Sequence, residues 1–140
     1  MAVKAKVLSF GIAIDRAGAI SAEAGAALSV PAGWQSEHLL LAGLARCSLT
    51  SLRYHARRIG IDHVAGGASA SGRVTKRGED GRYAFVEIEC RIDVDLDRDL
   101  PPGDLRALLV KAERDCFVGA SLTASPDYRW TVNGEAVSFG

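Results

Sequence analysis

The longest strongly periodic stretch of the sequence is QSEHLLLAGLARCSLTSLRYHARRIG, residues 35–60, and it predicts a central helix. Small and apolar side chains recur in it at steps of mostly three and four, which places them on one helix face: Leu40, Gly43, Leu44, Cys47, Ser51 and Tyr54. Gln35 or Ser36 suits the start of this helix, and Gly60 suits its end. Cys47 is therefore expected to point inward, where a cysteine is most often a small core residue.

The residues before this helix predict a small meander of strands. Alternation in residues 3–14 predicts a strand with one buried face, formed by Lys6, Leu8, Phe10, Ile12 and Ile14. A turn at residues 15–18 follows, and then two shorter strands over residues 19–24 and 27–30.

The clearest strand signal covers residues 84–96, where apolar and charged side chains alternate. The apolar row consists of Ala84, Val86, Ile88, Cys90, Ile92, Val94 and Leu96. Cys90 is therefore expected in the core, beneath a helix. A preceding strand near residues 69–76 and the hairpin signal Asn133-Gly134 complete the predicted strands.

A second helix is predicted over residues 105–115, with Asp104 as its N-cap and an apolar inner face of Leu105, Leu108, Leu109 and Ala112. Cys116 follows at the end of this helix, at a joint where a thiol can move. Strands and helices in this order predict the α+β class, with helices laid against antiparallel sheet.

The composition limits the class of protein. A chain of 140 residues is expected to form one domain over residues 1–140. Its 17 basic and 17 acidic side chains cancel, which argues against a nucleic-acid partner. No run approaches the roughly 18 apolar residues of a membrane span, and the alternating first residues do not resemble a signal peptide, so a cytoplasmic protein is expected. The three cysteines and three histidines lack zinc-like spacing, so neither a metal nor another cofactor is expected.

Cys47 and Cys116 belong to two helices that must bury their apolar faces in one small core, so their sulfur atoms could be neighbours. The chemistry that needs such a pair is the reduction of a peroxide, in which one thiolate becomes a sulfenic acid and the second thiol condenses with it. An arginine would stabilise the thiolate and a carboxylate would orient the arginine, and Arg16 and Glu37 are the candidates. About 15 Å of helix separates Glu37 from Cys47, so Glu37 would act through an arginine or in a neighbouring subunit. The simpler interpretations are a solvated turn residue for Arg16 and a helix-start charge for Glu37.

Four runs resemble the OsmC/Ohr family, the osmotically inducible and organic hydroperoxide resistance proteins: SEHLLLAGLARCSLTSLRYHARRIG, CRIDVDLD, KAERDCFVGASL and YRWTVNG. The most specific features are Glu37 ten residues before a mid-helix Cys47, and a second cysteine, Cys116, after an intervening sheet and helix. The resemblance implies an OsmC-like fold, with antiparallel sheets packed on two central helices, in an intertwined homodimer.

The resemblance also implies a thiol-dependent peroxidase. Cys47 would be the peroxidatic thiol, Cys116 would resolve it as an intramolecular disulfide, and Glu37 and Arg16 would complete the site. The implied partners are a second copy of the chain, a small peroxide, organic or hydrogen peroxide, and an external dithiol reductant, without nucleic acid or membrane.

The sequence departs from the family pattern in two places. Ser36 and Phe117 stand where family members commonly have proline, before the glutamate and after the second cysteine. Arg16 matches only by its place in the first turn, and Arg46 and Arg53 are alternatives. Two other functions stay open: a non-catalytic dimeric module that binds a small apolar ligand between its helices, and an interaction scaffold with three core cysteines.

Overall fold

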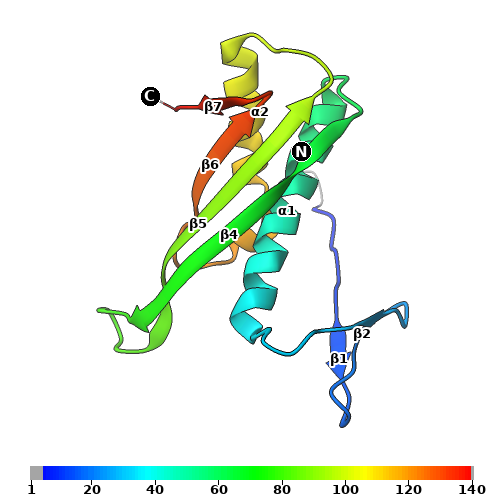
Figure 1. Ribbon diagram of the computed structural model, residues 1–140, viewed down its shortest axis with the longest axis vertical. Helices are drawn as coiled ribbons and strands as arrows, with labels where there is room; N and C mark the ends of the chain where they lie inside the picture. The colour runs from blue at the N-terminus through cyan, green and yellow to red at the C-terminus, as the bar shows by residue number, and fades with distance from the viewer. Residues whose placement is uncertain (1–4, 140) are drawn as a thin grey trace. The chain divides into compact units, whose positions relative to one another are not determined.

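The computed structural model describes residues 5–139, which divide into two compact units. The first unit ends at Trp34 and the second begins at Gln35. Each unit has its own sheet (Figure 1).

The first unit is a small antiparallel sheet whose strands pair in chain order: β1 (Ile12–Ile14), β2 (Ile20–Ala22) and β3 (Ala27–Leu28). Asp15 closes the turn between β1 and β2, because its Oδ1 accepts hydrogen bonds of 2.9 Å from the backbone N–H groups of Ala17 and Ala19. The predicted meander is confirmed, with shorter strands than expected.

The strand predicted over residues 3–14 is wrong in length and in burial. Within the described residues only Ile12–Ile14 is strand, and residues 3 and 4 lie outside them. The row predicted to be buried is 59–81% exposed in the single chain, at Leu8, Phe10, Ile12 and Ile14. The physical reason is that three short strands cannot build a core that would cover these side chains.

The second unit places two long helices on one face of a four-stranded sheet (Figure 1). Its elements in chain order are α1 (Ser36–Arg58), β4 (Val64–Lys76), β5 (Tyr83–Leu96), α2 (Pro102–Arg114), α3 (Phe117–Ala120), β6 (Asp127–Val132) and β7 (Glu135–Val137). The sheet order is β4-β5-β6-β7, with antiparallel pairs except for β5 and β6, which are parallel. The antiparallel sheet predicted from the sequence is confirmed for β4–β5 and β6–β7, whereas β5 and β6 are parallel because α2 and α3 carry the chain back before β6 begins.

Helix α1 begins as predicted. Gln35 is its N-cap, and the backbone N–H of Gln35 donates a hydrogen bond of 2.9 Å to Nδ1 of His38. The buried face consists of Leu44, Ser48, Ser51, Leu52 and Ala56. This face is rotated from the predicted one, so Cys47 lies at its edge and is half-buried, while Tyr54 is exposed.

Helix α2 begins earlier than predicted, with Pro101 rather than Asp104 at its N-cap. Proline fits the first helical turn because its missing N–H is not needed there, and Asp104 then lies in the first turn, beside the positive end of the helix dipole. Leu108, Leu109 and Ala112 are buried, as the sequence predicts.

The core of the second unit lies between these helices and the sheet. Strand β5 alternates as predicted, with Ile88, Cys90, Ile92, Val94 and Leu96 buried. The predicted hairpin at Asn133-Gly134 is also confirmed, since both residues have positive φ (51° and 82°) and connect β6 to β7.

Candidate functional site

The second unit brings Cys47 and Cys116 together. Cys47 comes from the middle of α1, and Cys116 is the N-cap residue of α3, directly after α2 ends. The two thiols are close enough for Cys116 to raise the pKa of Cys47, and both are free thiols. Cys47 is half-buried, whereas Cys116 is completely buried.

Two opposing influences act on the pKa of Cys47. Burial raises this pKa above its usual value, and the neighbouring Cys116 raises it further. The backbone N–H groups of Val118 and Phe117, at the start of α3, donate hydrogen bonds to the Cys47 sulfur and lower the pKa. Burial is the largest of these effects, so within one chain the net shift favours the protonated thiol.

Ser48 connects Cys116 to the third cysteine. Its Oγ lies 3.6 Å from the Cys90 sulfur and 3.6 Å from the Cys116 sulfur, and it donates a hydrogen bond of 2.9 Å to the Leu44 carbonyl. Ser48, Cys90 and Cys116 are all almost inaccessible to solvent. The sulfurs of Cys90 and Cys116 therefore both lie beside Ser48, the residue of α1 that directly follows Cys47.

Tyr128 completes the polar part of this cluster. Its hydroxyl interacts with Cys116 and Ser48, and burial together with the nearby Cys116 raises the Tyr128 pKa above its usual range. Gly119 makes this approach possible, because a Cβ at position 119 would overlap the Tyr128 hydroxyl and lie 3.4 Å from the Cys116 sulfur.

The other predicted site residues lie apart from this cluster or in the other unit. Glu37 is exposed in the first turn of α1, where the Ser36 hydroxyl donates to its carboxylate (3.3 Å). Arg16 is exposed in the β1–β2 turn of the first unit. Arg46 and Arg53 are exposed on α1, and Arg53 Nε donates to the Val64 carbonyl (3.4 Å). Within described residues 35–139, no cationic side chain contributes to the shift of the Cys47 pKa.

A polar contact joins α1 to the end of α2, directly before Cys116. His55 Nε2 of α1 lies 2.7 Å from Oδ2 of Asp115, the C-cap residue of α2 that directly precedes Cys116. Arg114 pairs with the same carboxylate (3.0 Å). These contacts tie the chain before Cys116 to helix α1.

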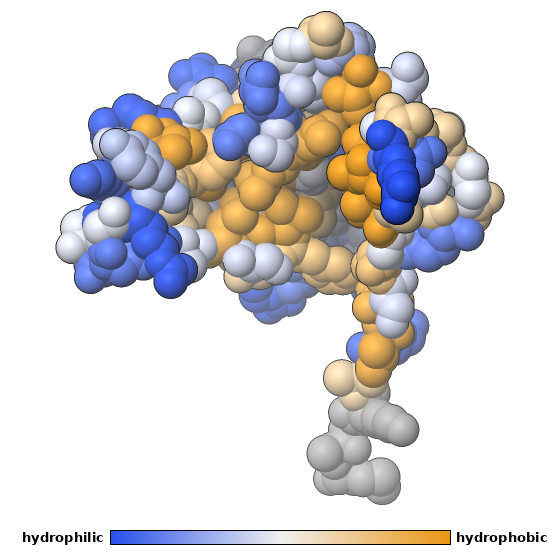
Figure 2. Space-filling view, turned by 90° about the horizontal axis from the view of Figure 1, so that it is seen from below, coloured by the Kyte–Doolittle hydropathy of each residue, from blue (hydrophilic) through white to orange (hydrophobic). Residues whose placement is uncertain are grey.

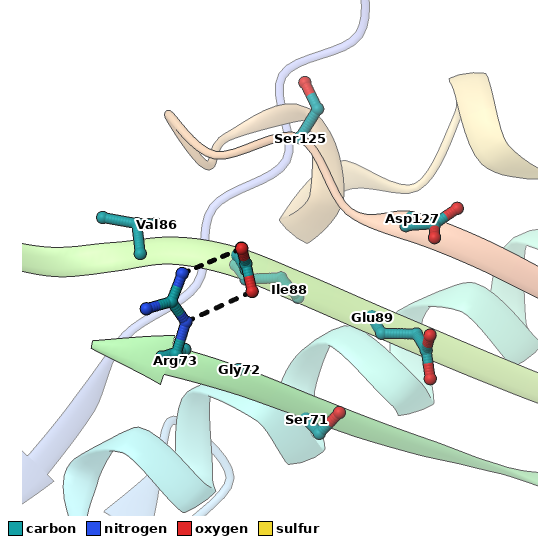
Figure 3. Close-up of a pocket in the computed structure, with 9 residues that line it drawn as sticks. Ser71, Gly72, Arg73, Val86, Ile88, Glu89, Ser125 and Asp127 are labelled. Atoms are coloured by element: carbon teal, nitrogen blue, oxygen red, sulfur yellow. Dashed lines mark hydrogen bonds and ion pairs between the residues drawn. The ribbon is translucent and has the colours of Figure 1, made fainter. Parts of the chain in front are cut away.

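A separate pocket of about 530 Å³ lies over strands β4 and β5 and contains no cysteine. Figure 3 shows Arg73 paired with the carboxylate of Glu87 there, with Glu89 and Asp127 nearby. The Arg73–Glu87 distance is 2.8 Å. Among the described residues that line this pocket, Arg73 is the cation, and its guanidinium is already paired with Glu87.

In residues 5–139 no group of three or more His, Cys, Asp or Glu side chains is placed to hold a metal ion. No helix of this same part of the chain combines the length and apolar character that crossing a membrane requires.

The fold and the cysteine cluster together define an α+β protein with a thiol pair between two helices. A model of the OsmC-like protein family matches residues 29–131, and the chain belongs to this family. The resemblance drawn from the sequence and the predicted OsmC-like fold are both confirmed.

Solved structures share the fold at low sequence identity. An OsmC-like protein from Mycoplasma pneumoniae is 15% identical, with 91% of this chain and 97% of that chain covered and a TM-score of 0.66. The organic hydroperoxide resistance protein OsmC from Legionella pneumophila is 18% identical (91% and 98% covered, TM-score 0.58). The organic hydroperoxide resistance protein OhrB of Bacillus subtilis is 21% identical (89% and 96% covered, TM-score 0.53). No curated protein matches the chain.

The sequence patterns did not reveal three members of the cluster. Ser48 follows Cys47 directly but lies one helical turn from Leu44, so its inward direction depends on how α1 is rotated on the sheet. Tyr128 is placed beside Cys90 by the parallel pairing of β5 and β6, which the sequence did not predict. Cys90 was correctly expected in the core, but its closeness to Ser48 and Cys116 depends on how α1 packs on the sheet.

Proposed function

We propose that this protein is a thiol-dependent peroxidase that reduces organic hydroperoxides or hydrogen peroxide. The observation that carries the proposal is the proximity of the Cys47 and Cys116 thiols, one half-buried and one buried, which come from residues 69 positions apart in the chain. The family and the relatives named as organic hydroperoxide resistance proteins support the same activity.

In the proposed reaction the Cys47 thiolate attacks one oxygen of the peroxide. The O–O bond breaks, an alcohol or water leaves, and Cys47 becomes a sulfenic acid. The Cys116 thiol then attacks the oxidised sulfur, releases water and forms the Cys47–Cys116 disulfide. An external dithiol reduces this disulfide by two exchange steps, which suits a reducing compartment such as the cytoplasm.

The reaction requires a thiolate at neutral pH, and burial alone opposes it. The N–H groups of Phe117 and Val118 supply part of the stabilisation of negative charge. We assign the remaining part to Arg16, oriented by Glu37, because a guanidinium can stabilise a thiolate and hydrogen-bond to a peroxide. Since Glu37 is about 15 Å along the helix from Cys47, Glu37 would act through an arginine or in the site of a neighbouring subunit.

A homodimer is part of the proposal. Figure 2 shows apolar side chains, in orange, gathered over a broad part of the surface seen from below. Large apolar residues of the first unit are exposed in the single chain, including Phe10 at 81% and Ile12 at 69%. Exposed apolar area of this kind is typical of a surface that another chain covers.

The activity is tested by the consumption of cumene hydroperoxide with a dithiol as reductant. We expect activity in the reduced protein, none above background in Cys47→Ser, and in Cys116→Ser a sulfenic acid at Cys47 that dimedone traps. Circular dichroism of each variant serves as the folding control. Full activity of Cys47→Ser would refute the proposal.

The second candidate function is a dimeric module that binds a small apolar ligand without turnover. The observation that favours it is the raised pKa of Cys47, since a binding module needs no thiolate. Phe117, in the place of the usual proline, is 60% exposed beside the cluster. The two functions differ in the pKa of Cys47 in the assembled protein, which lies near neutrality only for a peroxidase.

A further inference from the structure

Cys90 is a nucleophilic group that the proposed peroxidase reaction does not use. It is fully buried in the centre of β5, between Ala70 of β4 and Tyr128 of β6. Burial raises the pKa of Cys90, with a smaller contribution from Cys116. A structural cysteine in this position would be expected to contact only apolar groups, but Cys90 faces the Ser48 hydroxyl.

The sulfurs of Cys90 and Cys116 both lie near the hydroxyl oxygen of Ser48. Each sulfur lies 3.6 Å from Ser48 Oγ, so the two sulfurs are at most twice that distance apart. The single hydroxyl hydrogen of Ser48 is donated to the Leu44 carbonyl (2.9 Å), which leaves the two lone pairs of the oxygen for the two thiols. Both thiols can thus donate toward the same oxygen atom.

Cys116 is the residue that both other cysteines can reach. It stands between the end of α2 and the first turn of α3, whereas Cys90 is held by strand neighbours on both sides. Cys116 interacts directly with Cys47 and, across Ser48, with Cys90. Of the three cysteines, Cys116 is therefore the one that interacts with both of the others.

We propose that Cys90 is a second disulfide partner of Cys116 and accepts the oxidation that begins at Cys47. This inference rests on the proposed peroxidase function. After the Cys47–Cys116 disulfide has formed, the Cys90 sulfur attacks the Cys116 sulfur, the Cys90–Cys116 bond forms, and the Cys47–Cys116 bond breaks. The proton of the Cys90 thiol passes to the departing Cys47 sulfur, so the exchange needs no further oxidant or reductant. The disulfide then joins two buried residues of the core, and Cys47 is again a free thiol.

Disulfide mapping after oxidation tests the exchange. The reduced protein receives one equivalent of cumene hydroperoxide, free thiols are blocked with N-ethylmaleimide, and the linked peptides are identified by mass spectrometry. In the wild type we expect a Cys90–Cys116 peptide together with maleimide-labelled Cys47. In Cys90→Ala we expect only the Cys47–Cys116 peptide, with labelling of Cys47 reduced roughly tenfold relative to the wild type. Cys90→Ser repeats the test with a side chain of similar size, in case the alanine variant folds poorly.

A second arm separates this inference from the peroxidase reaction. Diamide oxidises thiol pairs without peroxide, so Cys47→Ser treated with diamide should form the Cys90–Cys116 disulfide directly. If Cys47→Ser keeps both thiols reduced, and the wild type forms only Cys47–Cys116 with peroxide, the exchange is refuted and the peroxidase function stands. If peroxide forms no disulfide in the wild type, both proposals fail.

Discussion

At the residue scale, Gly119 determines how closely the Tyr128 hydroxyl approaches Cys116. A methyl group at position 119 would occupy the place of that hydroxyl. Glycine is therefore required here by a close approach and not by its backbone angle, since Gly119 has no positive φ.

We expect Gly119→Ala to lower the free energy of unfolding by about 1–3 kcal/mol, because the new methyl must displace the Tyr128 ring from its packed position. Denaturant unfolding measures the change. Gly103→Ala is the matched control, since a Cβ there meets nothing within 4 Å. In a Tyr128→Phe background Gly119→Ala should cost much less, and an equal cost in both backgrounds would contradict the explanation.

Single substitutions can also show which arginine lowers the pKa of Cys47. The pH at which Cys47 reacts with iodoacetamide at half its maximal rate reports its pKa, and removal of a nearby cation raises a thiol pKa. We therefore expect Arg16→Ala to shift this midpoint upward by about one unit or more. Arg46→Ala and Arg53→Ala are the controls and should leave the midpoint in place. A shift confined to either control would assign the role to that arginine instead.

At the scale of secondary-structure elements, the His55–Asp115 pair joins α1 to the end of α2. A double-mutant cycle with His55→Ala and Asp115→Ala should give a coupling free energy of about 0.5–1 kcal/mol, as expected for a partly exposed ion pair. Arg114 chiefly, and His55 with it, hold the pKa of Asp115 below its usual value. The stabilisation is therefore present above the usual pKa of about 4 and lost as the pH falls through the lower folded value.

Thermal unfolding of the wild type and Asp115→Asn between neutral and strongly acid pH measures this contribution. The two melting temperatures should differ at pH 7 and converge at the acid end, since a protonated Asp115 no longer attracts its cationic partners. A difference that persists in full at the acid end would assign the effect to something other than charge.

The elements themselves were predictable where the pattern depends on local chemistry. The 3.6-residue period of α1, the alternation of β5 and the Asn133-Gly134 turn each follow from neighbouring residues, and each is confirmed. The rotation of α1 about its axis was not predictable, because it is set by packing on the sheet. The parallel pairing of β5 with β6 was missed because it joins segments separated by two helices.

The site was predictable only in part for the same reason. The sequence indicated that Cys47 and Cys116 belong to helices sharing one core, and in the structure Cys116 is near enough to affect the pKa of Cys47. The positions of Ser48 and Tyr128 depend on helix rotation and strand order, which are tertiary properties. The roles of Glu37 and Arg16 stay predictions.

At the scale of the whole molecule, the proposed homodimer would cover the exposed apolar residues of the first unit. We expect Phe10→Glu to raise the dissociation constant of the proposed homodimer at least roughly tenfold, because a charge would replace a large apolar contact. Sedimentation velocity over a range of protein concentrations measures it. Ala17→Glu is the control, since it adds the same charge to the same unit with the loss of only one methyl group. A chain that stays monomeric at all concentrations would refute the dimer.

The parallel β5–β6 pair also has a consequence for synthesis on the ribosome. The β4–β5 hairpin and α1 are complete when residue 96 has been made, but β6 begins only at Asp127. Until then Cys90 lacks its neighbour on β6, and until residue 116 has been made Cys116 is absent altogether. A nascent chain at that stage therefore carries Cys47 and Cys90 without Cys116. An oxidant would then join Cys47 to Cys90, which differs from both disulfides proposed for the finished protein.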